Sequence, residues 1–156
     1  MSIFRFSRAL VGALFAAGAL SACESMPLET GKAPETLEMK ATMTAAKEIP
    51  PKGGNGEGYA IMWYNTGTRA LTWKVYYTGL SGSATAAHIH GPADTTANAG
   101  VVIPLAQGAP SSPMTGSATL SPQQADDMMA GKWYVNVHTQ ANPGGEIRGQ
   151  VMQEAW

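Results

Sequence analysis

The sequence predicts an all-β fold, an antiparallel Greek-key-like β-sandwich or barrel with one short helix. Three observations lead to this prediction. Only 13% of the 156 residues are charged, and 18 Gly and 10 Pro supply many turn formers, a composition that argues against coiled coils and helical bundles. Several segments alternate apolar and polar residues with the period of two that marks a half-buried strand. Turn formers separate these segments at the spacing typical of sandwiches and barrels.

The first predicted strand covers residues 37–45, where apolar residues hold the odd positions and polar residues hold the even ones. After a segment rich in Pro and Gly, residues 59–64 are aromatic and rich in β-forming side chains. Residues 65–68 read Asn-Thr-Gly-Thr, and residues 71–77 resume the alternation. These three segments therefore predict a β-hairpin.

Five further strands and one helix are predicted along the rest of the chain. The strands are expected at residues 84–90, 101–105, 116–120, 133–139 and 146–153. The helix begins with Ser121 as its N-cap, Pro122 at the first helical position and Gln124 at the capping-box position, and Gly131 ends it.

Methionine and tryptophan side chains within the strand patterns are predicted to fill the core. The expected members are Met39, Met43, Met62, Trp63, Trp73 and Trp133. Methionine sulfur is also a soft ligand for Cu(I), but the strand positions favour a place in the core.

The N-terminus is predicted to be an export signal rather than part of the fold. Arg5 and Arg8 precede a run of twelve apolar or small residues at 9–20, which is shorter than the ~20 residues of a membrane-spanning helix. The run ends at Leu20-Ser21-Ala22-Cys23, which closely resembles the bacterial lipobox, where a signal peptidase cuts before the cysteine and lipid is attached to it. The alternative is an ordinary or uncleaved signal peptide that leaves Cys23 as a free thiol.

Cleavage before Cys23 would divide the chain into three parts. Residues 1–22 would be the lipoprotein signal peptide, residues 23–36 a lipid-anchored tether, and residues 37–156 the β domain. Two acyl chains such as palmitate suffice for stable membrane attachment. Within the lipobox resemblance, Glu24 after the cysteine indicates the outer membrane. We therefore expect a protein anchored in the bacterial envelope that faces the periplasm or the cell surface.

Charge and cysteine content exclude several kinds of partner and site. The formal net charge is −1 and no cluster of Lys or Arg occurs, so nucleic acid is not an expected partner. A single Cys cannot form an intrachain disulfide or a CxxC motif. The sequence contains no nucleophile elbow and no Gly-rich phosphate loop. Nothing in it requires an enzyme, and no catalytic residue is assigned.

All three histidines lie in predicted strands, His88 and His90 in one and His138 in a later one. Residues two apart on a strand face the same side with Cα atoms ~6.6 Å apart, so the rings of His88 and His90 can converge on one ion. Alternation in the later strand places His138 on its polar face. Imidazole suits copper and zinc, and the Irving–Williams order favours Cu(II) in an exported protein. The alternative is that these histidines only form hydrogen bonds with a carboxylate or carbonyl group.

Four more polar residues are candidates to support the histidines. Glu146 and Arg148 share a face of the last strand; as a pair they could brace the histidines or orient a ring, although a plain cross-strand ion pair is the favoured interpretation. Glu48 precedes two prolines and is interpreted as a solvated loop carboxylate, with a role beside the histidines as the alternative. Asn136 shares the polar face of its strand with His138.

The sequence also resembles the CHRD domain over residues 37–153. The matching blocks are Lys47–Pro51, Gly79-Leu80, Ala87–Ala93, Tyr134–Thr139 and Asn142–Gln150. The last two blocks are the specific ones. This family is named after chordin and is common in exported bacterial proteins. The resemblance implies an all-β domain and leaves the biochemical role open.

The H-x-H strand with a later strand histidine is also similar to the copper side of the Cu/Zn superoxide dismutase sandwich. This is an analogy at the level of the fold. The four-His copper site and the His-rich zinc site of that enzyme cannot both be built from three histidines. The count therefore argues against superoxide dismutation.

These observations lead to one functional hypothesis and two alternatives. The main hypothesis is a lipid-anchored envelope protein that binds one copper or zinc ion through His88, His90 and His138. The first alternative is a metal-free interaction or adhesion module that presents a strand face to a protein partner in the envelope. The second alternative is a small copper oxidoreductase.

Overall fold

The computed structural model describes residues 33–106 and 108–153, which fall within one compact unit of the chain. The predicted signal peptide, Cys23 and most of the predicted tether lie outside these residues. The elements are β1 (Thr36–Thr44), η1 (Ala45–Lys47), β2 (Glu57–Asn65), β3 (Ala70–Thr78), β4 (Ala84–His90), β5 (Val101–Pro104), β6 (Met114–Thr119), α1 (Pro122–Met129), β7 (Tyr134–Thr139), β8 (Ile147–Gln150) and β9 (Met152–Gln153). No helix within the described ranges has the length and apolar character that a bilayer crossing requires.

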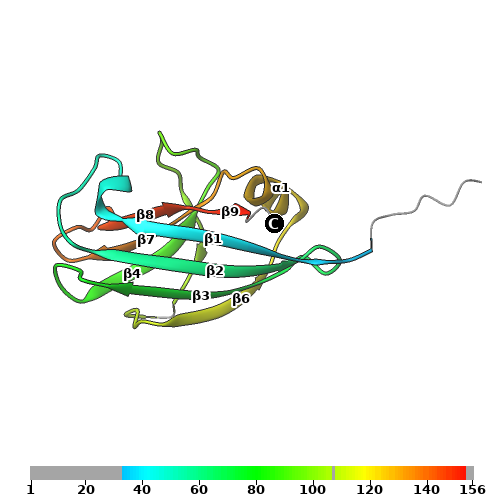
Figure 1. Ribbon diagram of the computed structural model, residues 1–156, viewed down its shortest axis with the longest axis horizontal. Coiled ribbons are helices and arrows are strands. Elements are labelled where there is room, and N and C mark those ends of the chain that lie inside the picture. The colour runs from blue at the N-terminus through cyan, green and yellow to red at the C-terminus, as the bar shows by residue number, and fades with distance from the viewer. Residues whose placement is uncertain (1–32, 107, 154–156) are drawn as a thin grey trace, which may run out of the picture. The chain divides into compact units, whose positions relative to one another are not determined.

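The strands form one antiparallel sheet with the order β5-β4-β7-β8-β1-β2-β3-β6, and β9 also pairs with β1 (Figure 1). The chain leaves β3 and enters β4, which lies far from β3 in the sheet. The sheet curls so far that residues of its two edge strands, β5 and β6, line one hollow. The prediction of an all-β, antiparallel sandwich or barrel with one short helix is confirmed.

The predicted hairpin forms between β2 and β3. Register pairs Tyr64 with Leu71 next to the turn, and the side chain of Asn65 holds the turn together. Its Oδ1 atom accepts hydrogen bonds from the backbone N–H groups of Gly67 and Thr68, at 3.0 and 2.8 Å. This is the Asx-turn chemistry that makes Asn favourable at such positions.

The helix is capped as its sequence predicts. The Ser121 hydroxyl accepts a hydrogen bond from Gln124 N at 3.2 Å, and Gln124 Oε1 accepts one from Ser121 N at 2.9 Å. Both halves of the capping box are therefore present, and Pro122 is the first helical residue. Gly131 follows the C-cap with a φ of 70°, the left-handed conformation that favours glycine.

The core contains most of the side chains that were expected there. Met39, Met43 and Met62 are fully buried, and Trp73 and Trp133 are nearly so. The prediction was wrong for Trp63, whose side chain is 37% exposed. Its strand neighbours Met62 and Tyr64 face the core, so the alternation of β2 turns the indole of Trp63 outward.

Strands β4, β7 and β8 carry the candidate site on the face opposite the core. His88 pairs with Asn136, and Asn136 pairs with Arg148, so these three side chains form one row across the strands. Ile89 and Val135 point the other way and are fully buried in the core.

The outer face of these strands is also covered, since all six residues of β7 are buried. The segment between β4 and β5, residues 91–100, forms hydrogen bonds with side chains of this face, as does the turn between β7 and β8 (Figure 1). A second, polar layer thus lies outside the apolar core.

Candidate metal centre

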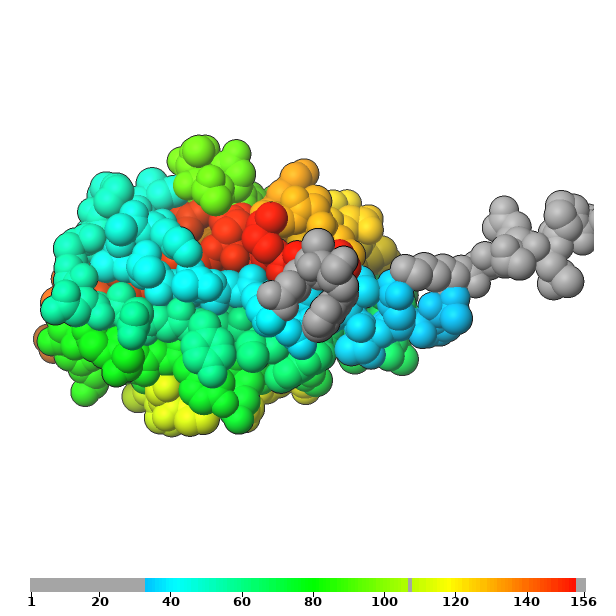
Figure 2. Space-filling view, viewed as in Figure 1, coloured from blue at the N-terminus to red at the C-terminus, as the bar shows by residue number. Residues whose placement is uncertain are grey.

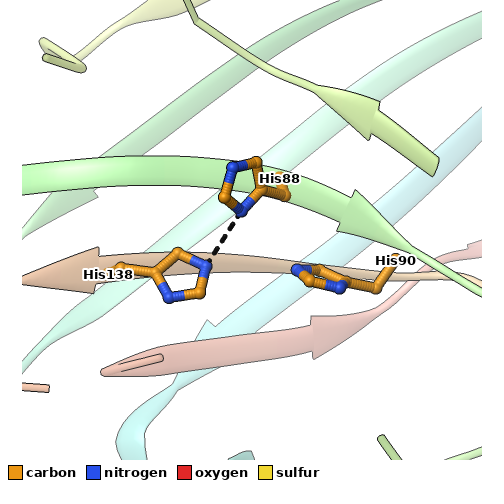
Figure 3. A group of neighbouring side chains, drawn as sticks. All are labelled: His88, His90 and His138. Atoms are coloured by element: carbon orange, nitrogen blue, oxygen red, sulfur yellow. Dashed lines mark hydrogen bonds between the residues drawn. The ribbon is translucent and has the colours of Figure 1, made fainter. Parts of the chain in front are cut away.

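The fold brings all three histidines together. His88 and His90 come from β4, and His138 comes from the neighbouring strand β7, where it pairs with Ala86. One nitrogen of each ring lies within 4.8 Å of the corresponding nitrogens of the other two. Figure 3 shows the three rings turned toward one another beside these two strands. The parity argument from the sequence therefore gave the right face for each ring.

Hydrogen bonds to backbone carbonyl groups set the proton positions on two of the rings. His90 Nδ1 lies 2.9 Å from Ala99 O, and His138 Nδ1 lies 2.9 Å from Pro143 O. A carbonyl oxygen can only accept, so each Nδ1 carries the proton and each Nε2 keeps a free lone pair. Carbonyl groups that hold a ring in this way are typical of histidines that bind metals.

The third ring, that of His88, forms its hydrogen bond with another histidine instead of a carbonyl group. His88 Nδ1 lies 3.1 Å from His138 Nε2 (Figure 3). Because His138 Nε2 is the acceptor, His88 Nδ1 donates a proton to it in the metal-free chain. A shift of that proton to His88 Nε2 would free Nδ1, so the three atoms available to a metal are His88 Nδ1, His90 Nε2 and His138 Nε2.

Burial favours the neutral rings that metal binding needs. Burial lowers the pKa of His88, and the neighbouring His138 and His90 lower it further. Burial also lowers the pKa of His138, an effect that the hydrogen bond to Pro143 opposes and the nearby His90 reinforces. Both rings are therefore neutral near pH 7 and can act as ligands without first losing a proton to solvent.

One buried nitrogen at the centre has no hydrogen-bond partner. His90 is 8% exposed, and its Nε2 atom is buried without a donor or acceptor beside it. An unpaired buried polar atom costs about 1–3 kcal/mol. A metal ion at the centre of the cluster would satisfy this atom, so the residues fit such an ion.

His90 is stacked on Tyr134, which is in turn stacked on Arg148. The ring of His90 lies on the ring of Tyr134 with a centroid separation of 4.9 Å and an interplanar angle of 4°. The guanidinium carbon of Arg148 lies 3.5 Å from the centroid of the same tyrosine ring. This cation–π contact fixes the tyrosine and thereby the plane of the histidine.

Arg148 also fastens the segment at residues 91–100 over the site. Its Nη2 donates to Asp94 O and Ala97 O at 3.0 and 2.9 Å, and its Nη1 donates to Asn98 Oδ1 at 2.8 Å. Ala99, in the same segment, supplies the carbonyl group that holds His90. Arg148, which is only 2% exposed, thus orients His90 by two routes.

Glu146 and Arg148 do not form the ion pair that the sequence suggested. Glu146 Oε1 accepts from Ser81 N at 2.6 Å, and Oε2 accepts from the hydroxyl groups of Ser81 and Thr139 at 2.6 and 2.5 Å. Asn142 Nδ2 adds a bond to Oε2 at 3.1 Å. Burial alone would raise the pKa of Glu146, but these hydrogen bonds outweigh burial and lower the pKa to about 2. Glu146 therefore anchors the turn that carries the partner of His138.

The interpretation of Glu48 as a solvated carboxylate was wrong, since its side chain is 4% exposed. Burial raises its pKa, whereas the charge of Arg148 and hydrogen bonds with Ile49 and Asn136 lower it to a smaller extent. Gly145, with a φ of 127°, makes room for it. A Cβ atom there would collide with the Glu48 carboxylate and lie 2.7 Å from Asn136 Nδ2.

A hollow of about 870 Å³ lies beside the supporting residues rather than over the histidines. Glu48, Arg148 and Gln150 contribute to its lining, and none of the three histidines does. Figure 2 shows the surface hollowed between the cyan residues near 40–50, the green residues near 95 and the red residues near 150.

The sequence reasoning missed Tyr134 and Ser81 as parts of the site. Tyr134 could have been found, because it lies two residues before Asn136 and four before His138 on the same strand face. No pattern in the sequence links Ser81 to the site. It lies 65 positions before Glu146, in a turn whose place in the fold depends on the sheet order.

Comparison with known proteins gives one family. Residues 39–151 match the family profile described as the CHRD domain. No curated protein and no solved structure matches the chain.

The low pKa of Glu146 predicts a loss of stability in acid. Its stabilising effect is fully present above about pH 4.5, the ordinary pKa of a glutamate, and disappears as the pH falls toward about 2. Urea unfolding between pH 7 and pH 2.5 should show that Glu146→Gln removes a pH-dependent component on the order of 2 kcal/mol. The exposed Glu57→Gln should keep the wild-type slope. An unchanged slope in Glu146→Gln would contradict the assignment.

The contacts of Arg148 predict that lysine cannot replace it. Arg148→Lys keeps the charge but loses the planar fork and the stacked guanidinium, and we expect it to lower the free energy of unfolding by about 2–4 kcal/mol. Hydrogen–deuterium exchange should show faster exchange of the Ala93 and Ala99 amides. Arg69→Lys, at an exposed arginine, is the matched control. Equal exchange rates in both variants would show that Arg148 does not fasten the segment.

Proposed function

The chain belongs to the CHRD domain family, and we propose that it binds one copper or zinc ion through His88, His90 and His138. The observation that supports this proposal best is the convergence of three ring nitrogens within 4.8 Å, two of them with their lone pairs freed by backbone carbonyl groups. A cluster of histidines that served only hydrogen bonding would leave His90 Nε2 buried and unpaired.

The spacing of the ligand atoms is close to what one ion needs. Three nitrogens bound at about 2.05 Å to a tetrahedral ion lie about 3.3 Å from one another. His88 Nδ1 and His138 Nε2 are already 3.1 Å apart. His90 Nε2 therefore has to approach them by at most about 1.5 Å, a movement that a ring rotation can supply. Imidazole ligands suit both metals, and Cu(II) is bound more tightly than Zn(II) by a given set of nitrogens.

The second part of the proposal concerns location. The Leu20–Cys23 motif, the basic residues before it and the apolar run between them support export and attachment of lipid to Cys23. Glu24 supports the outer membrane over the inner one. The protein would then hold its β domain by a short tether at the envelope, either in the periplasm or at the cell surface.

The metal proposal is tested by analysis of the protein after expression of the whole sequence in cells that export it. We expect about one equivalent of metal per chain, an EPR spectrum with nitrogen couplings for the copper form, and a higher melting temperature on addition of metal. His88→Ala should lower the metal content at least tenfold. Thr85→Ala, at an exposed position of the same strand, should not change it.

Two results would contradict the proposed site. One is a wild-type chain without metal whose melting temperature is the same with and without Cu(II) or Zn(II), which would favour a metal-free interaction module. The other is metal uptake that His88→Ala leaves unchanged, which would show that the metal binds elsewhere than at the three histidines.

The lipid anchor is tested by fractionation and palmitate labelling. The wild-type chain should incorporate labelled palmitate and sediment with outer membranes, because two or more acyl chains hold a protein firmly in a bilayer. Cys23→Ser should lose the label and leave the membrane fraction. Ser21→Ala keeps a small residue before the cysteine and should behave as the wild type. An unlabelled wild-type chain in the soluble fraction would disprove the anchor.

A further inference from the structure

The histidines leave part of the metal's coordination sphere open. Zn(II) in proteins is almost always bound by four ligands, and Cu(II) prefers a tetragonal set of at least four. Among the residues that the structure describes, the group of His, Cys, Asp and Glu side chains at this position contains only the three histidines. The remaining position therefore requires another kind of ligand.

Asn136 is a buried polar residue beside His88. Register sets it directly opposite His88, with Cβ atoms about 4.5–5.5 Å apart for such pairs. His138 lies two residues further along the same strand, so its side chain is on the same face. The amide of Asn136 thus lies on the face that carries the three imidazole rings.

The side-chain oxygen of Asn136 has no partner. Asn136 is 3% exposed, and its Oδ1 atom is buried without a hydrogen bond. The orientation of the amide is fixed on its other side, where Nδ2 lies beside the Glu48 carboxylate and the open Cα of Gly145. If Oδ1 and Nδ2 of Asn136 exchanged places, Oδ1 would lie against the Glu48 carboxylate, and the two groups would repel each other. A buried acceptor is therefore left for a donor that is not part of the chain.

Taken with the proposed metal site, on which this inference rests, the geometry points to a small exogenous ligand at the fourth position, held by a hydrogen bond to Asn136 Oδ1. In the resting protein this ligand is water. Asn136 is a positioning residue, which accepts a hydrogen bond from the ligand and is itself held by Glu48. The site would thus take small protic molecules and exchange them for small anions.

Burial limits the size of the ligand. His90 and His138 are each 8% exposed, and the segment at residues 91–100 lies over this face. His88 has intermediate exposure and is not among the buried residues, so the open side of the cluster is at His88. A ligand of two or three atoms can enter there, whereas a peptide or a sugar cannot reach the metal without moving the covering segment.

The first experiment uses the copper-loaded protein, expressed from the whole sequence. Pulsed EPR in D2O should show deuterons of one water molecule bound at an equatorial position. Titration with azide, followed by its charge-transfer absorption, should show displacement of this water. Copper bound without water deuterons and without an azide complex would overturn the inference and leave the metal site intact. A chain without copper would instead overturn the proposed function.

Two variants at Asn136 should move the azide affinity in opposite directions. Asn136→Leu removes the acceptor that holds water, and azide cannot donate a hydrogen bond, so azide should bind about fivefold more tightly, equal to about 1 kcal/mol. Asn136→Asp places a carboxylate at the open position, which should take the place of water, abolish its deuteron signal and weaken azide binding at least tenfold.

Thr85→Ala is the control, because Thr85 is an exposed residue of β4. Its azide affinity should stay within twofold of the wild type. A residue with a merely structural role would not shift the affinity both ways. If both Asn136 variants bind copper and azide as the wild type does, Asn136 does not face the fourth position and the inference is wrong.

Discussion

The buried guanidinium of Arg148 is the interaction on which the polar half of the molecule depends. A charge that is 2% exposed is stable only where the protein supplies hydrogen-bond acceptors and electrostatic partners in place of water. Arg148 finds three oxygens in the segment at residues 91–100 and a ring face on Tyr134. Most of this segment is exposed, so apolar contacts hold little of it in place. The position of His90 follows from these contacts.

The molecule is built from two layers that share strands β4 and β7. Alternation sends Ile89 and Val135 into the apolar core and sends the histidines and Asn136 to the opposite face. On each of these strands, the side chains on one face pack in the apolar core, and those on the other face form the candidate metal site. The buried polar network around Glu48, Glu146 and Arg148 closes the outer layer. This network is where substitutions should affect the site while leaving the core packing unchanged.

Period-two alternation and turn chemistry predicted most of the fold. The strand at residues 84–90, the hairpin around residues 65–68 and the capped helix after Ser121 all occur as expected, because each depends on neighbours in sequence. The prediction failed for Trp63 for a local reason, because the alternation of its strand turns the indole outward. It failed for Glu48 because its burial depends on residues distant in sequence, Asn136 and Gly145, which lie beside its carboxylate.

The sequence by itself determined which face of each strand the three histidines occupy, because side-chain direction on a strand follows from position alone. Export and lipid attachment at Cys23 stay predictions from the sequence. Only the tertiary structure decided that His138 lies beside His88, since that depends on β4 pairing with β7. The same holds for the partners of Glu146 and Arg148, which come from segments up to 65 residues away. Contacts between distant segments depend on which arrangement of the whole chain buries the most apolar surface and satisfies the most hydrogen bonds. A local sequence pattern does not contain this information.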